Sequence, residues 1–185
     1  LVEVSSIATG YRVLNELIKR APVHILDANL TEPSKFVIVF WGPLAAVEEA
    51  MEAALETAGS KLLFRLLIPY AHRNLITALA GSMFTEEFYD TIGVVDCESL
   101  SATLIACDRA LKDAHVSLVG LRLVNGLGGR GFFVVHGAQH DVEAAVGAAA
   151  AAVEEGSGPL GRVVQSAVVT QVQAEMVPWV MKTGV

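Results

Sequence analysis

The sequence predicts an α+β protein built from two tandem ferredoxin-like domains, each an antiparallel four-stranded sheet with helices on one face. Two observations predict this fold. The 185-residue chain contains an internal repeat, and a repeat at a fixed spacing indicates duplication of one structural unit. Each copy also has hydrophobic patterns in the order strand, helix, strand, strand, helix, strand, which is the ferredoxin-like order.

The repeat is visible by direct alignment. Residues 2–26 align with residues 95–119 without a gap, at an offset of 93. After the following loop the offset becomes 95, so that Val37 aligns with Phe132 and Gly42 with Gly137. The two-residue change falls in a loop, where insertions are tolerated best. We therefore expect a first domain at residues 1–84 and a second at residues 85–185.

Each copy begins with a short strand, expected at residues 1–4 and 92–97, and continues into a helix. Ser5 or Ser6 and, in the second copy, Ser99 are plausible N-caps, because a hydroxyl can accept from the free backbone N–H groups. Apolar residues recur at helical spacing in both helices, namely Ile7, Tyr11, Leu14 and Ile18 in the first and Leu100, Leu104, Cys107 and Leu111 in the second.

Two strands joined by a loop follow in each copy, at residues 23–28 and 36–41 and at residues 116–123 and 132–136. The second helix is expected at 44–58 and 141–154. Its apolar stripes contain Val47, Met51, Ala54 and Leu55 in the first copy and Val142, Ala145, Val146 and Ala149 in the second. A last strand, at 62–68 and 163–169, completes each domain, and a short tail helix can follow it.

The loop of the second copy is rich in glycine. Gly126, Gly128 and Gly131 fit the spacing of a dinucleotide-binding turn, but that turn requires a strand before the glycines and a helix after them. Residues 132–135 are bulky and partly β-branched, which favours a strand. The loop therefore joins two strands. We interpret it as a hairpin whose backbone crowds against copies of itself around a symmetry axis, rather than as a nucleotide site.

Composition narrows the function classes. Hydrophobic residues make up 53% of the chain and the mean hydropathy is +0.51, yet no stretch approaches the ~20 apolar residues of a membrane span. Such a composition suggests apolar surface buried between subunits. The net charge is −7 without a basic cluster, which argues against nucleic acid as a partner. Two cysteines, Cys97 and Cys107, are too few for a disulfide scaffold and favour a cytoplasmic location.

Several motifs resemble those of one family. They are Ser-Ile-Ala-Thr-Gly at 6–10 with Leu-Ile-Lys-Arg-Ala-Pro-Val at 17–23, the stretch at 106–116, the Gly-x-Gly-Gly loop, the stretch at 136–146, and Leu-Ile-Pro-Tyr-Ala-His at 67–72. Each half resembles the bacterial microcompartment shell domain (BMC domain). Two domains in one chain resemble the tandem, trimer-forming class, and the order of the first copy resembles its non-permuted members, as in propanediol-utilisation shells.

The resemblance implies a structural protein rather than an enzyme. It implies a homotrimer that forms a flat pseudohexameric tile and assembles with other shell proteins into the microcompartment shell. It also implies a central pore for small polar metabolites, lined by the strand–strand loops, which here contain Thr31, Glu32, Pro33, Ser34 and Lys35 in the first copy and Asn125, Gly126, Leu127, Gly128, Gly129 and Arg130 in the second. We expect Glu32 and Lys35 to lie close enough to offset each other's charge.

The resemblance further implies that a lysine at the end of the first helix lies at the tile edge, where Lys19 and Lys112 stand in the two copies. The alternative for both is a solvated charge that interacts with the C-terminal end of the helix dipole. Some non-permuted relatives hold an iron–sulfur cluster through a cysteine in the first-copy loop. Residues 31–35 contain no cysteine, so we expect no such cofactor.

Other chemistry finds little support in the sequence. His24, His72, His115, His136 and His140 have no Asp, Glu or Cys partner recurring at metal-ligand spacing, so no metal site is expected. We find no nucleophile elbow, P-loop or zinc motif. The alternative to a shell tile is a ferredoxin-like trimeric protein that binds ligands or catalyses a reaction at sites between subunits. A tile forms sheets or tubes, whereas such a trimer stays discrete.

Overall fold

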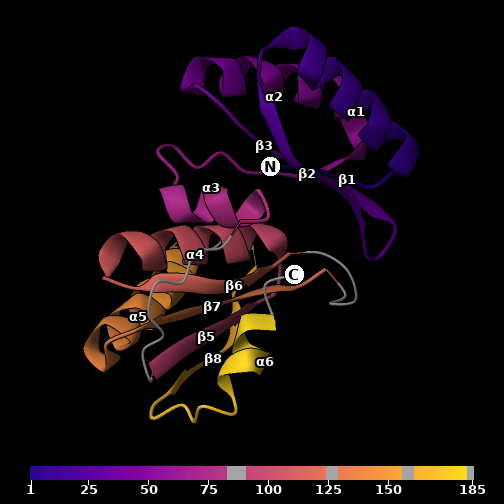
Figure 1. Cartoon of the computed structure of the whole chain (residues 1–185). Coiled ribbons are helices and arrows are strands. Elements are labelled where there is room, and N and C mark those ends of the chain that lie inside the picture. The colour runs from indigo at the N-terminus through magenta and orange to yellow at the C-terminus, as the bar shows by residue number, and fades with distance from the viewer. Residues whose placement is uncertain (83–90, 124–128, 156–160, 183–185) are drawn as a thin grey trace. The chain divides into compact units, whose positions relative to one another are not determined.

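The computed structural model describes residues 1–82, 91–123, 129–155 and 161–182. The chain forms two compact units (Figure 1), of which unit 1 contains Leu1–Pro69 and unit 2 begins at Tyr70. The predicted domain boundary between residues 84 and 85 lies outside the described residues and stays a prediction. Residues 70–82 follow the first sheet in sequence but are part of unit 2.

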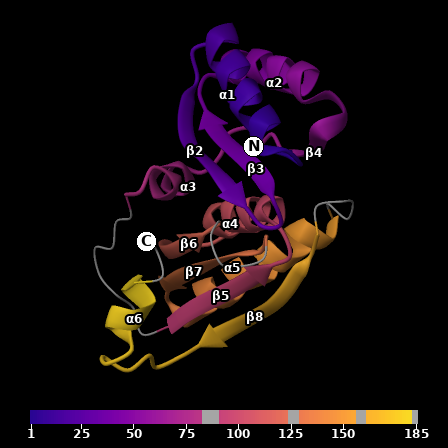
Figure 2. The same ribbon diagram turned by 90° about the vertical axis from the view of Figure 1, so that its right-hand side faces the viewer.

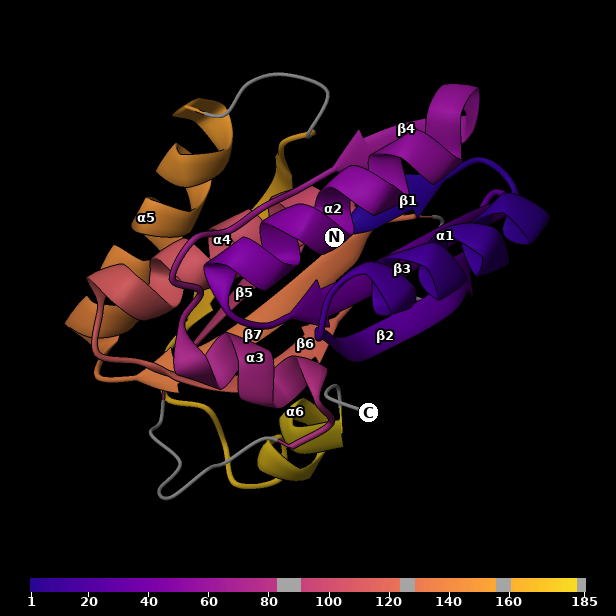
Figure 3. The ribbon, with the colours of Figure 1, turned by 90° about the horizontal axis from the view of Figure 1, so that it is seen from above.

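Unit 1 contains one four-stranded antiparallel sheet and two long helices. Its elements are β1 (Val2–Val4), α1 (Ile7–Arg20), β2 (His24–Thr31), β3 (Lys35–Trp41), α2 (Leu44–Ala58), the 3₁₀ turn η1 (Gly59–Lys61) and β4 (Leu62–Arg65). The strand order is β2-β3-β1-β4 and every pair is antiparallel. In Figure 3, α1 and α2 lie side by side over this sheet. The predicted element order is confirmed, although β4 ends at Arg65 rather than Ile68.

Unit 2 repeats this topology and adds two short helices. Its elements are α3 (Arg73–Leu79), β5 (Thr91–Cys97), α4 (Leu100–Asp113), β6 (Ser117–Arg122), β7 (Gly131–Gly137), α5 (Gln139–Glu155), β8 (Val163–Val169) and α6 (Val177–Lys182). The strand order β6-β7-β5-β8 matches that of unit 1 (Figure 2). The α+β fold with two antiparallel sheets is therefore confirmed. Within the described ranges, none of the helices has the length and hydropathy needed to cross a membrane.

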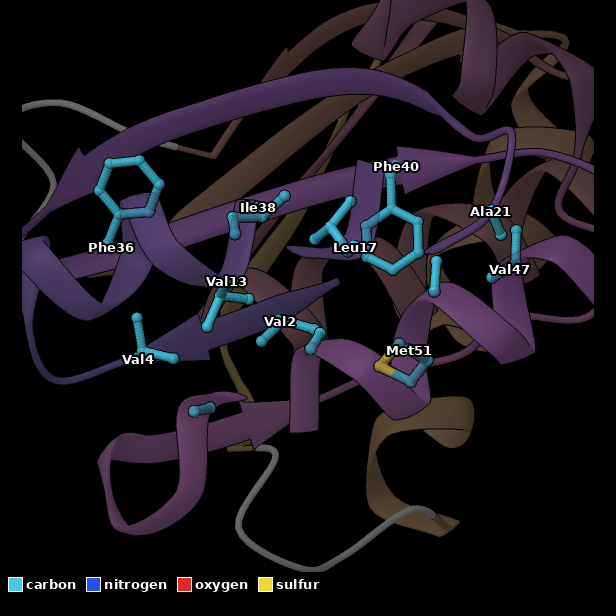
Figure 4. Packing of buried hydrophobic residues seen from close by; sticks show 13 residues of the cluster. Val2, Val4, Val13, Leu17, Ala21, Phe36, Ile38, Phe40, Val47 and Met51 are labelled. Carbon is cyan, nitrogen blue, oxygen red and sulfur yellow. The ribbon is translucent and has the colours of Figure 1, made fainter. Parts of the chain in front are cut away.

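The core of unit 1 follows from the alternation of side chains along its strands (Figure 4). Val2 and Val4 on β1, and Phe36, Ile38 and Phe40 on β3, point to the same face of the sheet. The helices cover this face with residues one turn apart, namely Val13 and Leu17 on α1 and Val47, Ala50, Met51 and Ala54 on α2. Small residues on α2 let the two helices pack closely over the sheet.

The first helix of each unit begins at the predicted serine. Ser6 Oγ accepts a hydrogen bond from the Thr9 backbone N–H at 3.3 Å, and Ser99 Oγ accepts one from the Ala102 N–H at 3.0 Å. Both serines have extended backbones and act as N-caps, which satisfies one otherwise free donor in each first turn. Each helix ends at a residue that returns to an extended conformation, Ala21 and Ala114.

The sheet of unit 2 is covered on both faces, which adds to the predicted single helical layer. A Cβ placed at Gly93 of β5 would meet Val142 and Val146 of α5. Its neighbour Ile92 points the other way and packs in a cluster with Val180 of α6. Helix α6, the short tail helix foreseen from the sequence, thus covers the face opposite α5 (Figure 2).

In each unit the first helix and a strand approach closely at a glycine, but the glycine lies on the helix in unit 1 and on the strand in unit 2. In unit 1 a Cβ at Gly10 of α1 would collide with the buried ring of Phe36 on β3. The repeat-equivalent residues in unit 2 are Thr103 on α4 and Gly131 on β7, and a Cβ at Gly131 would collide with the Thr103 side chain. In both units one residue of the pair must be glycine, because the other fills the gap between helix and strand.

Replacing Gly10 with alanine is expected to destabilise the protein by about 1–3 kcal/mol, because the added methyl must displace a buried ring in a packed core. The matched control is Gly147→Ala in α5, where a new Cβ would have nothing within 4 Å. That substitution should leave stability unchanged or raise it by about 0.5–1 kcal/mol, since alanine favours a helix over glycine. Urea unfolding followed by far-UV circular dichroism measures both; equal effects would contradict the packing account.

Candidate functional site

The first candidate pore loop is the tip of the β2–β3 hairpin. Thr31 pairs with Lys35 across the hairpin, and residues 32–34 form the turn between them. Thr31 is buried, whereas Glu32, Pro33 and Ser34 are exposed. Ser34 adopts a positive φ of 54°, a conformation that is common at the end of a three-residue hairpin loop. The hairpin therefore presents the Glu32 carboxylate at its tip.

Lys35 does not neutralise Glu32 in this structure. Its Nζ lies 2.6 Å from Glu3 Oε1 on the adjacent strand β1. Glu3 pairs with Val37, so Lys35 lies two residues from the position opposite Glu3 and on the same face of the sheet. The Glu3 side chain is 9% exposed, and a nearly buried carboxylate requires a partner. The expectation that Glu32 and Lys35 offset each other is wrong within one protomer, and no ion pair to Glu32 occurs among the described residues.

The second candidate loop is described only in part. Asn125, Gly126, Leu127 and Gly128 lie outside the described residues, so their placement stays a prediction. Gly129 has a φ of 83°, and Arg130 is exposed immediately before β7. Arg130 is the repeat equivalent of Lys35. Both loops therefore join two strands of a sheet. The cation at the equivalent position is exposed in the second loop, as Arg130, and paired with Glu3 in the first, as Lys35.

The two candidate edge lysines differ in their surroundings. Lys19 at the end of α1 has a side chain that is 63% exposed and contacts Glu16, whose side chain is also exposed, at 3.1 Å. Lys112 at the end of α4 has a side chain that is 34% exposed, and its Nζ lies 2.6 Å from Oδ2 of the nearly buried Asp108. Exposed pairs such as the first contribute little to stability, whereas a half-buried pair supports the fold.

Asp108 links the α4 helix to the segment that precedes α3. Its Oδ2 binds Lys112, and its Oδ1 accepts a hydrogen bond from the His72 backbone N–H at 2.7 Å. Sequence reasoning missed this residue, although Asp108 and Lys112 are four apart on one helix and that spacing is typical of an ion pair. The repeat equivalent of Asp108 is Asn15, so unit 1 has no carboxylate at this position and Lys19 turns to Glu16 instead.

Three of the five histidines, His24, His72 and His136, pack or hydrogen-bond within the fold. His24 stacks on the ring of Trp41, with 5.2 Å between ring centroids. His72 Nδ1 accepts from the Asn74 N–H at the start of α3. His136 is buried on β7, and burial lowers its pKa below the ordinary value. In the part of the chain that the structure describes, no group of three or more His, Cys, Asp or Glu side chains could hold a metal ion.

The two cysteines are buried in unit 2. Burial raises the pKa of the Cys97 thiol to about 11 and holds the pKa of Cys107 well above its usual range. Both thiols therefore stay protonated near neutral pH. Because the thiolate is the reactive form, neither cysteine is suited to nucleophilic or ligand chemistry in the folded chain.

Comparison with known proteins places these features in a family. The family model described as BMC domain matches twice, at residues 1–71 and 91–172. The bacterial microcompartment shell protein PduT of Citrobacter freundii is 30% identical over 176 residues, covering 95% of this chain and 93% of that protein. A microcompartment protein of Desulfitobacterium hafniense DCB has a crystal structure that superposes with a TM-score of 0.88 and 26% identity, covering 96% of both chains.

A further solved structure shares the fold alone. The fused permuted hexameric shell protein MSM0275 from the RMM microcompartment superposes with a TM-score of 0.63 at 22% identity, covering 84% of this chain and 83% of that one. That protein is described as permuted, whereas the two BMC matches in this chain begin with the strand before the first long helix, β1 before α1 and β5 before α4. The difference in element order agrees with the lower TM-score.

Removing the two lysines separately is expected to have different effects on stability. Lys112→Ala leaves the nearly buried Asp108 without its cation and should cost about 1–3 kcal/mol. Lys19→Ala removes an exposed contact and should leave the melting temperature nearly unchanged. Differential scanning calorimetry at low salt compares the two variants directly. Equal melting temperatures for both would contradict the asymmetry between the lysines.

The protein is expected to lose stability as the pH falls below about 6.5, the ordinary pKa of histidine. Because burial lowers the pKa of His136 in the folded state, the unfolded chain binds its proton first and acid favours unfolding. The urea midpoint should fall between pH 7.5 and pH 5.5, and less so in His136→Gln. His140→Gln, whose side chain is 83% exposed, should keep the wild-type pH slope; if both variants keep it, His136 is not the cause.

Proposed function

Because the chain belongs to the BMC domain family and carries two such domains in tandem, we propose that it is a structural tile of a bacterial microcompartment shell. Three copies form a flat pseudohexamer, and these tiles assemble with other shell proteins around a compartment in the cytoplasm. The proposal includes no catalytic role. It draws support from the relative named as a shell protein, which matches over 93% of its own length.

The observation that carries the proposal is the duplication of one complete fold. Each unit has its own four-stranded sheet with the same strand order. Cyclic assemblies are the common way in which identical chains close on themselves, and three chains with two similar domains each supply six positions around an axis. A domain of this size also has a modest core of its own, so contacts with neighbouring domains add stability.

The pore in this proposal is formed by the hairpin tips and the glycine-rich loops. Three copies of residues 31–35 alternate around the axis with three copies of residues 125–130. Lys35 is held by Glu3, so the first loops contribute the Glu32 carboxylates without a neighbouring cation from the same hairpin. The second loops contribute Arg130, and glycine lets their backbone N–H groups approach a polar solute. The proposal is that small polar metabolites pass through this pore.

Lys19 and Lys112 are proposed to lie at the tile edge with unequal roles. Lys19 is free to contact a neighbouring tile, because its side chain is mostly exposed and its contact with Glu16 is weak. Lys112 already forms an ion pair with Asp108 of its own helix. The edges of one tile would then alternate between a stronger and a weaker contact, with the stronger one supplied by unit 1.

Negative-stain electron microscopy of the purified protein tests the proposed function. We expect flat hexagonal particles about the size of six such domains, and extended sheets or tubes at high protein concentration. Adding a known partner shell protein should incorporate the chain into closed shells. Discrete globular particles that form no sheets under any of these conditions would contradict a tile and favour the ligand-binding alternative.

Lys19→Ala is expected to reduce sheet formation severalfold while the particles themselves stay intact. The reason is that Lys19 makes no contact that the fold requires, whereas a contact between tiles repeats at every edge. Glu16→Gln is the matched control, since it removes the exposed partner of Lys19 but keeps the amine. The sedimentation of sheets is measured as a function of protein concentration. Unchanged sedimentation of Lys19→Ala would show that Lys19 makes no contact at the tile edge.

Glu32→Gln is expected to change the charge preference of the pore. Removing three carboxylates from one ring should slow the entry of a cationic dye into assembled shells and speed the entry of an anionic dye of equal size. Glu49→Gln on the exposed side of α2 removes the same charge away from the hairpin tip. Identical dye ratios in the two variants would show that Glu32 does not line the route.

A further inference from the structure

Glu3 is a charged residue at the centre of an otherwise apolar strand. It lies between Val2 and Val4 of β1, which point into the core of unit 1 (Figure 4), so its own side chain points to the opposite face of the sheet. The Glu3 side chain is 9% exposed, and its partners across the two neighbouring strands are Val37 and Phe64. A carboxylate that has lost most of its water beside apolar neighbours requires a partner that compensates its charge.

Lys35 supplies this partner from the hairpin that contains the first proposed pore loop. It pairs with Thr31 at the last register position before the turn, and its Nζ lies 2.6 Å from Glu3 Oε1. Lys35 is two residues from Val37 on β3 and is therefore the diagonal neighbour of Glu3 on the same face of the sheet. The flexible lysine stem reaches across that diagonal. The ammonium group is thus directed along the sheet, away from the hairpin tip.

Lys35 has two acidic neighbours, Glu3 on the adjacent strand and Glu32 in the turn that the hairpin closes. Glu32 is exposed, so water solvates its charge and an ion pair there would contribute little. Glu3 is nearly buried, so leaving its charge unpaired costs more free energy, and the Coulomb attraction is stronger where water is excluded. The burial of Glu3 therefore decides which carboxylate Lys35 neutralises, and Glu32 keeps its charge.

The second unit does not repeat this ion pair. The equivalents of Glu3 and Lys35 are Asp96 and Arg130. Asp96, whose side chain is one methylene shorter, is exposed on β5, and Arg130 is exposed immediately before β7. Within residues 91–123 and 129–155 no ion pair joins these two side chains. The strand framework is therefore the same in both units, but only unit 1 combines it with a buried carboxylate that binds the cation of its hairpin.

We propose that Glu3 is a positioning residue that sets the charge of the pore from outside the pore loop. By binding Lys35 it keeps the first hairpin anionic at its tip, where Glu32 is exposed. Without the Glu3 carboxylate, Lys35 has Glu32 as its remaining acidic neighbour, and the three hairpins lose their net negative charge. This inference rests on the proposed trimer and its pore, and it identifies the residue that determines the charge of one of the two loops.

Chemical labelling of lysine side chains tests whether Glu3 holds Lys35. The folded protein is acetylated with a limiting amount of an amine-reactive reagent, at a concentration below that at which sheets form, and peptide mass spectrometry gives the extent of reaction at each lysine. We expect Lys35 to react severalfold more slowly than Lys19, whose side chain is 63% exposed. In Glu3→Gln, which removes the charge and keeps the size of the side chain, Lys35 should react severalfold faster than in the wild type, because its ammonium group is no longer held against the sheet.

Two further variants control this measurement. Glu16→Gln removes the exposed partner of Lys19 and should leave the reaction rate at Lys19 nearly unchanged. Arg130→Lys keeps the native Glu3 and places an amine at the repeat position that has no buried partner; this amine should react faster than Lys35 of the same molecule, a comparison that does not depend on the folding of Glu3→Gln. An unchanged rate at Lys35 in folded Glu3→Gln, or equally slow reaction at positions 35 and 130, would overturn the proposal.

Dye entry into assembled shells tests the consequence for the pore. Glu3→Gln should lower the ratio of cationic to anionic dye entry, in the same direction as Glu32→Gln. Adding Lys35→Gln to Glu3→Gln should restore the wild-type ratio, because Glu32 then again has no cation beside it. If Glu32→Gln changes the ratio and Glu3→Gln does not, this inference is wrong while the pore stands. If neither variant changes the ratio, the proposed pore itself is contradicted.

Discussion

The packing of the first helix of each repeat is the constraint on which the rest of the structure depends. That helix has apolar residues on two faces, and its own sheet covers only one of them. In unit 2 the second face is buried, with α3 packed on the helix, while in unit 1 it is open. A single chain therefore leaves apolar surface exposed that only another element can cover, which fits the composition of a protein that functions in an assembly.

Duplication has let the two repeats diverge around a common framework. The glycine that permits close packing lies on the helix in unit 1 and on the strand in unit 2, opposite Phe36 and Thr103 respectively. Asp108 binds both Lys112 and the chain before α3, whereas its equivalent Asn15 leaves Lys19 free of any buried partner. Covalent linkage allows such differences, because the two copies of the domain are encoded separately within one chain and can change independently.

The element order and the strand–strand loops could be predicted from the sequence, because the spacing of apolar residues distinguishes helices from strands and the two copies show the same order. Which face of α1 is buried could not, because Val13 and Leu17 and the exposed stripe of Tyr11 and Ile18 are equally apolar. The partner of Lys35 was also missed. Glu3 lies far from it in sequence and meets it only because β1 and β3 are neighbours in the sheet.

The molar mass in solution tests the central claim most directly. Light scattering across a range of micromolar concentrations should give about three times the 19.6 kDa of one chain, since the proposed trimer covers apolar surface that a single chain leaves exposed. A mass that stays at that of one chain at every concentration would contradict the account, because the apolar surfaces would have no partner among copies of this protein.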